Sequence, residues 1–235
     1  MVTRRIAVIL ARGGSKRLPR KNILEFGGKP MLAWSVGAAL DSGLFERVLL
    51  STDDEEIAAV GRRYGAEVPF LREVASDDIS SSSMATHAAL LQAERHWHTR
   101  FDVVAQLMAN CPLRTSQDIQ NGIAAFEHSL APSQISCFRF GWMNPWWAIS
   151  LKEDGTPERL FPEALNARSQ DLPPLYCPSG ALWLAKRDPF VESQNYYMNG
   201  HRFEPLHWMS AVDIDDDDDL VMARMCLGIR DLEMQ

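Results

Sequence analysis

The chain has 235 residues, of which 46% are hydrophobic and 23% charged, and its formal net charge at pH 7 is −7. An acidic balance argues against a nucleic-acid-binding protein, which usually carries a basic face. No run approaches the ~20 apolar residues of a membrane-spanning helix, so we expect neither a nucleic-acid nor a membrane partner. The four cysteines are far apart, which favours reduced thiols and, because the N-terminus does not have the pattern of a signal peptide, a cytoplasmic location.

Strand-like and helix-like patterns alternate through the first half of the chain. In order, we predict a strand at 6–10, a helix at 30–40, a strand at 47–51, a helix at 54–64, a helix at 84–97, a strand at 102–108 and a helix that Ser116 caps and that ends near 126. Strands that alternate with helices at this spacing form a parallel sheet with helices on both faces. The sequence therefore predicts a three-layer α/β/α, Rossmann-like fold with a mainly parallel sheet.

A different pattern occupies residues 141–174. This stretch is rich in Trp, Pro and polar residues and has no clear helical periodicity, so we predict a small β-rich arm inserted into a single domain that spans residues 1–235. The arm is too apolar to stand free in water, which predicts a homodimer in which it packs against the partner subunit. Strand character returns at 182–185, and the last helix is expected from about 217 to about 228.

Residues 11–22 follow the first predicted strand directly and form a basic loop with five cationic side chains: Arg12, Lys16, Arg17, Arg20 and Lys21. Ligands of open α/β sheets bind at the carboxyl ends of the strands, so this position predicts a phosphate site. Gly13 and Gly14 would let the backbone approach the phosphates and present its amides. The alternative is a solvated, charged surface loop. The G-x-x-x-x-G-K-[ST] motif is absent, and so is the G-x-G-x-x-G fingerprint, which disfavours a dinucleotide-dependent oxidoreductase.

The loop sequence ARGGSKRLPRKN and the FGGKP that follows it at 26–30 resemble the N-terminal signature of the CMP-sialic acid synthetases. Further segments match that family in order and extend the resemblance over nearly the whole chain: 48–58, 64–72, 76–78, 112–114, 168–173 and 213–215. The resemblance implies a nucleotidyltransferase fold and an enzyme that transfers CMP from CTP to the anomeric hydroxyl of a nonulosonic acid, an acidic nine-carbon sugar, with release of pyrophosphate. The alternatives are an activity like that of the more distant CMP-Kdo synthetases and a non-catalytic nucleotide-sensing protein on the same fold.

The resemblance also implies which residues bind the nucleotide. Arg12 and Lys21 would hold the CTP phosphates and act in catalysis, whereas Asn22 would contact the cytosine. Asp53 and Asp54 are either caps of the next helix or ligand contacts. The segment that contains Ser-Asp-Asp at 76–78 is expected near the nucleotide. The full predicted nucleotide-binding set is Arg12, Gly13, Gly14, Ser15, Lys16, Lys21, Asn22, Arg72 and Ser81.

Asp213 and Asp215 are two positions apart, so on an extended segment both side chains point to one face while Ile214 points to the other. Two adjacent carboxylates are costly unless a cation lies between them, and Mg²⁺ takes one or two carboxylates together with phosphate oxygens and water. We therefore predict Mg²⁺ as a cofactor, with Asp213 and Asp215 as its ligands and Asp215 acting in catalysis. The alternative, an acidic helix start, suits residues 217–219.

The sugar-binding positions that the resemblance implies are Met108, Arg168 and Gln170, and Gln106 is added to the predicted set because of its place on the strand. Family members typically have Gln where this chain has Met108, and a thioether forms no strong hydrogen bond. An apolar wall predicts an acceptor with a methyl or deoxy group, such as legionaminic or pseudaminic acid, in preference to N-acetylneuraminic acid. Gln106, on the same strand face, could supply the lost polar contact, and a structural role in the arm is the alternative for Arg168 and Gln170.

Overall fold

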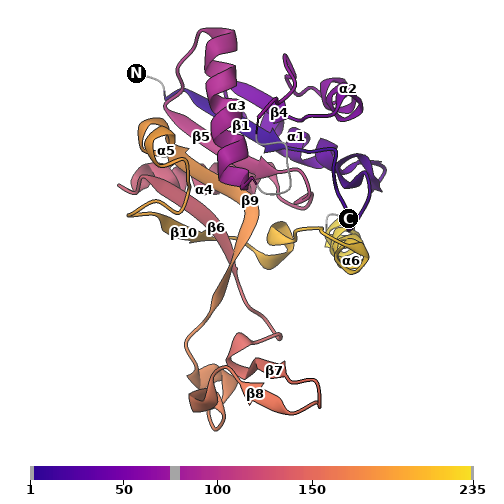
Figure 1. Cartoon of the computed structure of the whole chain (residues 1–235), viewed down its shortest axis with the longest axis vertical. Coiled ribbons are helices and arrows are strands. Elements are labelled where there is room, and N and C mark those ends of the chain that lie inside the picture. The colour runs from indigo at the N-terminus through magenta and orange to yellow at the C-terminus, as the bar shows by residue number, and fades with distance from the viewer. Residues whose placement is uncertain (1–2, 75–79, 234–235) are drawn as a thin grey trace.

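A six-stranded sheet forms the centre of the molecule in the computed structural model, which describes residues 3–74 and 80–233 (Figure 1). The strand order is β10-β6-β9-β5-β1-β4. β1 pairs in parallel with β4 and β5, and β10 with β6, whereas β9 is antiparallel to both of its neighbours. The predicted segment at 76–78 lies outside the described residues. The strand bounds are β1 Arg5–Leu10, β4 Arg47–Ser51, β5 Val103–Met108, β6 Ser133–Arg139, β9 Tyr176–Lys186 and β10 Arg202–Pro205.

Helices cover both faces of this sheet. One face carries α1 (Met31–Ser42), α2 (Glu55–Arg63) and α4 (Ser116–His128), and the other carries α3 (Ser82–Trp97) and α5 (Arg187–Ser193). The continuous apolar run of β1 follows from this arrangement. Ala7 and Ile9 face the first group of helices, Ile6 and Val8 face the second, and all four are fully buried. The predicted three-layer fold with a mainly parallel sheet is confirmed.

The last helix, α6 (Asp217–Glu233), lies beside the sheet, next to the segment that follows β1 (Figure 1). Its Leu220 and Ala223 pack with Leu18 of the basic loop and with Phe26 of the small hairpin formed by β2 (Glu25–Phe26) and β3 (Lys29–Pro30). This contact brings the acidic residues before α6 close to the basic loop. None of the helices within residues 3–74 and 80–233 is long and apolar enough to cross a lipid bilayer.

Two of the helix boundaries that differ from the prediction have a clear physical reason. Thr115, not Ser116, caps α4, because the Thr115 hydroxyl accepts a hydrogen bond from the Asp118 amide (3.1 Å) and the Asp118 carboxylate accepts one from the Thr115 amide (2.8 Å). α6 continues to Glu233 instead of ending near residue 228, so Gly228 lies inside the helix. A glycine there costs only about 1 kcal/mol relative to alanine, which the packing of α6 outweighs.

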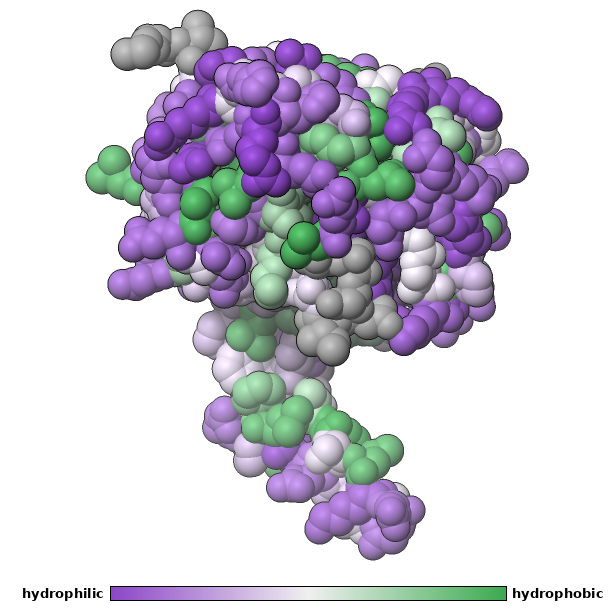
Figure 2. Space-filling view, turned by 45° about the horizontal axis from the view of Figure 1, so that its top comes forward, coloured by the Kyte–Doolittle hydropathy of each residue, from purple (hydrophilic) through white to green (hydrophobic). Residues whose placement is uncertain are grey.

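Residues 141–174 leave the sheet between β6 and β9 and project from it as an arm (Figure 1). The arm holds one hairpin, of β7 (Ile149–Leu151) and β8 (Pro157–Arg159), and the short 3-10 helices Pro145–Trp147, Pro162–Ala164 and Ser169–Asp171. Its own packing is small, with an edge-to-face contact between Trp146 and Phe161 (ring centroids 5.1 Å apart). Large apolar side chains stay exposed, such as Trp142 at 87%, and Figure 2 shows hydrophobic side chains on the surface of the arm. That the arm takes part in dimerisation stays a prediction.

Candidate active site

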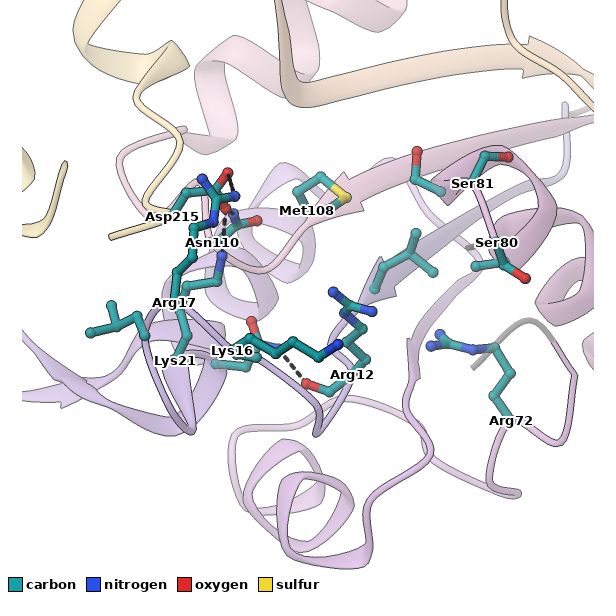
Figure 3. A pocket seen from close by; sticks show the side chains of 16 residues that line it. Arg12, Lys16, Arg17, Lys21, Arg72, Ser80, Ser81, Met108, Asn110 and Asp215 are labelled. Atoms are coloured by element: carbon teal, nitrogen blue, oxygen red, sulfur yellow. Dashed lines mark hydrogen bonds and ion pairs between the residues drawn. The ribbon is translucent and has the colours of Figure 1, made fainter. Parts of the chain in front are cut away.

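A cavity opens beyond the carboxyl ends of β1 and β5 (Figure 3). β4 lies on one side of β1 and β5 on the other, so the chain changes direction of winding at β1. The carboxyl end of β1 is therefore a topological switch point, where open α/β sheets bind their ligands. The cavity brings together residues that are far apart in the sequence. The predicted site residues that line it are Arg12, Ser15, Lys16, Lys21, Asn22, Arg72, Ser81, Met108 and Asp215.

Acidic residues at the junction of β4 and α2 hold the basic loop in place. Asp53 accepts a hydrogen bond from the Gly13 amide (3.0 Å), and Arg20 forms an ion pair with Asp54. The same Asp54 caps α2 through a first-turn amide (3.0 Å). The hydrogen bond from Arg20 holds the pKa of the Asp54 carboxyl below its usual value, against the opposing effect of burial. Of the two roles considered for Asp54, capping is therefore the one that the structure shows.

Gly13 and Gly14 do not line the cavity. Asp53 accepts the hydrogen of the Gly13 amide in this structure, so the predicted contact of that amide with phosphate stays a prediction. A Cβ atom at Gly13 would lie 2.8 Å from a carboxylate oxygen of Asp54, whereas one at Gly14 would meet nothing within 4 Å. The close approach of the loop to Asp54 therefore favours glycine at position 13 over any residue with a Cβ atom.

The cationic side chains of the loop line the middle of the cavity. Figure 3 shows Arg12 and Lys16 between Lys21 at one end and Arg72 at the other. Asn22 is buried, and its amide nitrogen donates a hydrogen bond to the carbonyl oxygen of Arg12 (2.9 Å). The orientation of the Asn22 side chain is thus fixed by the backbone of the loop that carries the cations.

Arg72 and the start of α3 form one end of the cavity. Arg72 is only 5% exposed, and its Nη1 donates to the carbonyl oxygen (3.0 Å) and the hydroxyl (3.1 Å) of Ser51, while its Nε finds no partner among the described residues. Burial lowers the pKa of Arg72, and the charge of Asp53 only partly opposes this. Ser81 caps α3, so the positive end of that helix dipole also faces the cavity. This end of the site is built for an anion.

Carboxylates gather at the opposite end. Lys21 donates to one oxygen of Asp215 (2.7 Å), and Arg17 forms an ion pair with the other. The amide nitrogen of Asn110 donates to the carboxylate of Asp213 and lies 3.3 Å from that of Asp215, so both carboxylates converge on one point. Arg17 was predicted only as one of the cations of the basic loop, and Asn110 was not among the predicted site residues. Their positions, in the basic loop and directly after β5, are the signals that point to them.

The surroundings shift the pKa values of the two carboxylates in opposite directions. Asp213 is open to solvent on one side, yet the protein around its carboxylate and the neighbouring Asp215 raise its pKa to about 6. Burial also opposes ionisation of Asp215, but the hydrogen bonds and charges of Lys21 and Arg17 outweigh it and lower the pKa of Asp215. A cation bound between the two carboxylates would offset both the burial of Asp213 and its repulsion by Asp215.

This donor set fits a hard divalent cation. The two carboxylates supply oxygen ligands, and the described residues offer no group of three His, Cys, Asp or Glu side chains that could complete a cage. A cation held here would take its other ligands from phosphate and water, which is the arrangement that Mg²⁺ prefers.

The predicted sugar-binding residues separate into three groups. Met108 lines the cavity at the end of β5. Gln106 lies on the same strand face but is fully buried, with its oxygen accepting from the Thr86 hydroxyl (2.8 Å) and its nitrogen 3.4 Å from the Ser82 hydroxyl. α3 takes up the hydrogen bonds of Gln106 in this arrangement, so the structure does not support its predicted polar contact with the sugar, which stays a prediction.

The other two predicted residues, Arg168 and Gln170, belong to the arm. Arg168 is paired with Asp171 (2.7 Å), which is the structural role considered for it, and its side chain is 73% exposed. Gln170 lines a separate hollow at the root of the arm. A single chain does not bring either residue to the cavity, and their contact with the sugar stays a prediction.

Comparison with known proteins identifies the class of this site. Residues 6–170 match the family model described as cytidylyltransferase. The chain belongs to the cytidylyltransferase family. It is therefore a nucleotidyltransferase enzyme, and the resemblance to the CMP-sialic acid synthetases is confirmed.

Individual relatives agree with this assignment. The chain is 33% identical over 223 residues to the pseudaminic acid cytidylyltransferase of Campylobacter jejuni, and the aligned region covers 94% of each of the two chains. It is 32% identical over 216 residues to the CMP-N,N'-diacetyllegionaminic acid synthase of Legionella pneumophila, with 89% of this chain and 90% of the relative covered. Among solved structures, CMP:2-keto-3-deoxy-manno-octonic acid synthetase complexed with CTP has the same fold, with a TM-score of 0.71, 16% identity and coverage of 97% and 100%.

The two loop glycines provide a matched pair of substitutions. Gly13→Ala should lower the free energy of unfolding by about 1–2 kcal/mol, because the new methyl group collides with Asp54, a cost typical of overpacking. Gly14→Ala should leave it unchanged or raise it by up to about 1 kcal/mol, since its site is open and its φ is not positive. Urea denaturation measures both, and equal stability of the two variants would contradict the role given to Asp54.

Proposed function

We propose that this enzyme transfers CMP from CTP to the anomeric hydroxyl of a nonulosonic acid and releases pyrophosphate. The observation that carries the proposal is a cavity with cations along its wall. At one end lies a buried guanidinium whose Nε has no partner among residues 3–74 and 80–233, and at the other end lie two converging carboxylates. A triphosphate with a divalent cation matches that distribution of charge. The names of the relatives, which act on pseudaminic and diacetyllegionaminic acids, support the acceptor class.

In this proposal the basic loop positions the nucleotide. Arg12 and Lys21 neutralise the triphosphate, Ser15 and Lys16 complete the phosphate cradle, and Asn22 contacts the cytosine with a side chain already oriented by the loop backbone. Arg72 and Ser81 extend the anion site toward the start of α3. Positioning and electrostatic stabilisation are the main contributions that a protein makes to phosphoryl transfer.

The reaction itself needs no covalent enzyme intermediate. The anomeric oxygen forms a bond to the α-phosphorus, the bond from that phosphorus to the oxygen bridging to the β-phosphorus breaks, and the hydroxyl proton passes to solvent. Asp213 and Asp215 are the residues that would hold Mg²⁺. When bound there, the ion would neutralise phosphate charge and favour loss of the hydroxyl proton.

Met108 is proposed to face the acceptor. Its position at the lining of the cavity and the lack of a polar substitute from Gln106 support a sugar with an apolar methyl or deoxy group. An eight-carbon acceptor has no specific support, since the similarity to the octonic acid synthetase structure concerns the fold alone. The four cysteines are free, which supports a cytoplasmic location.

Acceptor choice can be measured by pyrophosphate release from CTP with N-acetylneuraminic, legionaminic and pseudaminic acids. We expect the deoxy acids to have the higher kcat/KM, and CTP to be used strongly over ATP. Met108→Gln should raise the relative kcat/KM of N-acetylneuraminic acid by roughly tenfold, or about 1.4 kcal/mol. Met225→Gln, on the exposed face of α6, is the matched control and should change nothing. A tenfold preference of the unaltered enzyme for N-acetylneuraminic acid would contradict the acceptor assignment. Equal use of ATP and CTP would contradict the contact of Asn22 with the cytosine.

Loss of a metal-binding carboxylate should affect turnover more than nucleotide binding. Asp215→Asn is expected to lower kcat on the order of 10²-fold, comparable with the loss of one electrostatic contact in a transition state, with a much smaller change in CTP affinity. Asp218→Asn, an exposed change of the same kind in the first turn of α6, should leave kcat unaltered. Full activity in EDTA, or in the Asp215 variant, would argue against the assigned ligands.

The exposed apolar side chains of the arm predict that the protein assembles as a dimer. Light scattering should show a homodimer, about twice the 26.5 kDa of one chain. Trp142→Asp in the arm should shift the equilibrium toward monomer, whereas Leu130→Asp, at a 95% exposed position outside the arm, should not. A stable monomer of the unaltered protein at micromolar concentration would rule out the proposed role of the arm.

A further inference from the structure

Arg17 occupies the carboxylate to which the divalent cation is assigned. It forms an ion pair with one oxygen of Asp215, and Lys21 holds the other oxygen at 2.7 Å. Figure 3 shows both basic side chains directed toward Asp215 at the same end of the cavity. Both come from the loop that is proposed to bind the triphosphate, so one set of cations has two competing anionic partners.

Asp215 cannot serve both kinds of cation equally well at the same time. A divalent ion that approaches the carboxylate meets the positive charges of Arg17 and Lys21, which repel it, and finds both oxygens already engaged. A bound triphosphate changes this balance, because it offers several negative charges within the cavity that these side chains line. Arg, with its planar fork of donors, matches phosphate oxygens well.

We propose that Arg17 is a positioning residue for the metal, which holds Asp215 in the nucleotide-free protein and moves to the triphosphate when CTP binds, so that the divalent cation takes its place. The proposal rests on the proposed function, since it assumes CTP and a divalent cation at this site. Arg17 would thus exchange between two partners, Asp215 and the triphosphate, and would not keep a fixed contact with phosphate.

Exposure distinguishes Arg17 from Lys21 as the residue that moves. The Arg17 side chain is 65% exposed, so it can change partners without disturbing the core, whereas that of Lys21 is only 12% exposed. Asn110 meanwhile keeps the acidic segment in place. Its side-chain Nδ2 donates to the carboxylate of Asp213 and to the carbonyl oxygen of Ile214 (3.1 Å), and its backbone carbonyl oxygen accepts from the Ile214 amide (2.9 Å). The carboxylates therefore stay aligned while Arg17 leaves.

Exchange of this kind couples the two ligands. If CTP removes Arg17 from Asp215, CTP must raise the affinity of the protein for the divalent cation, and by linkage the cation must raise the affinity for CTP. Removing Arg17 should then have opposite effects on the two ligands measured separately. Metal binding to the nucleotide-free protein should tighten, and CTP binding without metal should weaken.

Arg20 supplies a matched control for this test. It lies in the same loop and carries the same charge, but it pairs with Asp54 and Glu56 instead of Asp215. Arg17→Gln and Arg20→Gln therefore make the same change in net charge, and only the first frees Asp215. Asp215→Asn, alone and combined with Arg17→Gln, shows whether any effect of Arg17 acts through that carboxylate.

The measurement is Mn²⁺ binding to the nucleotide-free full-length protein, from the electron paramagnetic resonance signal of free Mn²⁺, with CTP affinity in EDTA measured by calorimetry. Arg17→Gln should bind Mn²⁺ roughly two- to fivefold more tightly, the size expected from loss of one partly exposed ion pair. It should bind CTP roughly two- to tenfold more weakly. Arg20→Gln should leave the Mn²⁺ affinity unchanged, and the gain in Mn²⁺ affinity should vanish in the Asp215→Asn background.

Unchanged or weaker Mn²⁺ binding by Arg17→Gln would overturn the inference, as would equal tightening by Arg20→Gln or a gain that persists without Asp215. Each of these results would leave the proposed function standing, provided that the unaltered protein binds Mn²⁺ in the presence of CTP beyond what CTP itself binds. Absence of that binding would instead overturn the metal assignment on which the inference depends.

Discussion

Five cationic side chains within twelve residues repel one another, and the basic loop can hold its shape only where carboxylates offset that repulsion. Two groups of carboxylates do so. Asp53 and Asp54 hold the loop against the junction of β4 and α2, and Asp215 holds its other end beside α6. The cations are therefore fixed at the carboxyl end of β1, where the ligand site of such a sheet lies. The remaining geometry of the site follows from this balance of charge.

The sequence predicts the core of this arrangement well because the signals there are local. The apolar run of β1 is buried on both faces, and the basic loop follows it directly, so the order along the chain also gives the order in space. The pairing of Asp213 with Asp215 depends only on the alternation of side chains along an extended segment. Ile214, between them, is fully buried as that alternation requires.

The parts that could not be predicted depend on contacts between distant segments. Asn110 meets Asp213 across 103 positions of sequence, and nothing local in either segment indicates the other. Periodicity predicts that Gln106 and Met108 share one face of the strand, but it does not indicate that the Gln106 side chain accepts a hydrogen bond from Thr86 of α3. β6, β10 and α5 were not predicted, since they are short or interrupted by polar residues, and the reversed direction of β9 becomes visible only once its neighbours are known.

The reversed direction of β9 also determines where the arm is attached. β6 runs in the direction opposite to β9, so the chain leaves β6 and re-enters β9 at one and the same edge of the sheet. That edge is the one at which β5, antiparallel to β9, ends at Met108 and the cavity begins. The arm is thus an insertion whose two ends lie side by side, at Arg139 and Tyr176, on the side of the sheet where the cavity opens. Replacement of residues 141–174 by another segment during evolution would change the surroundings of the acceptor and leave the order and pairing of all six strands as they are.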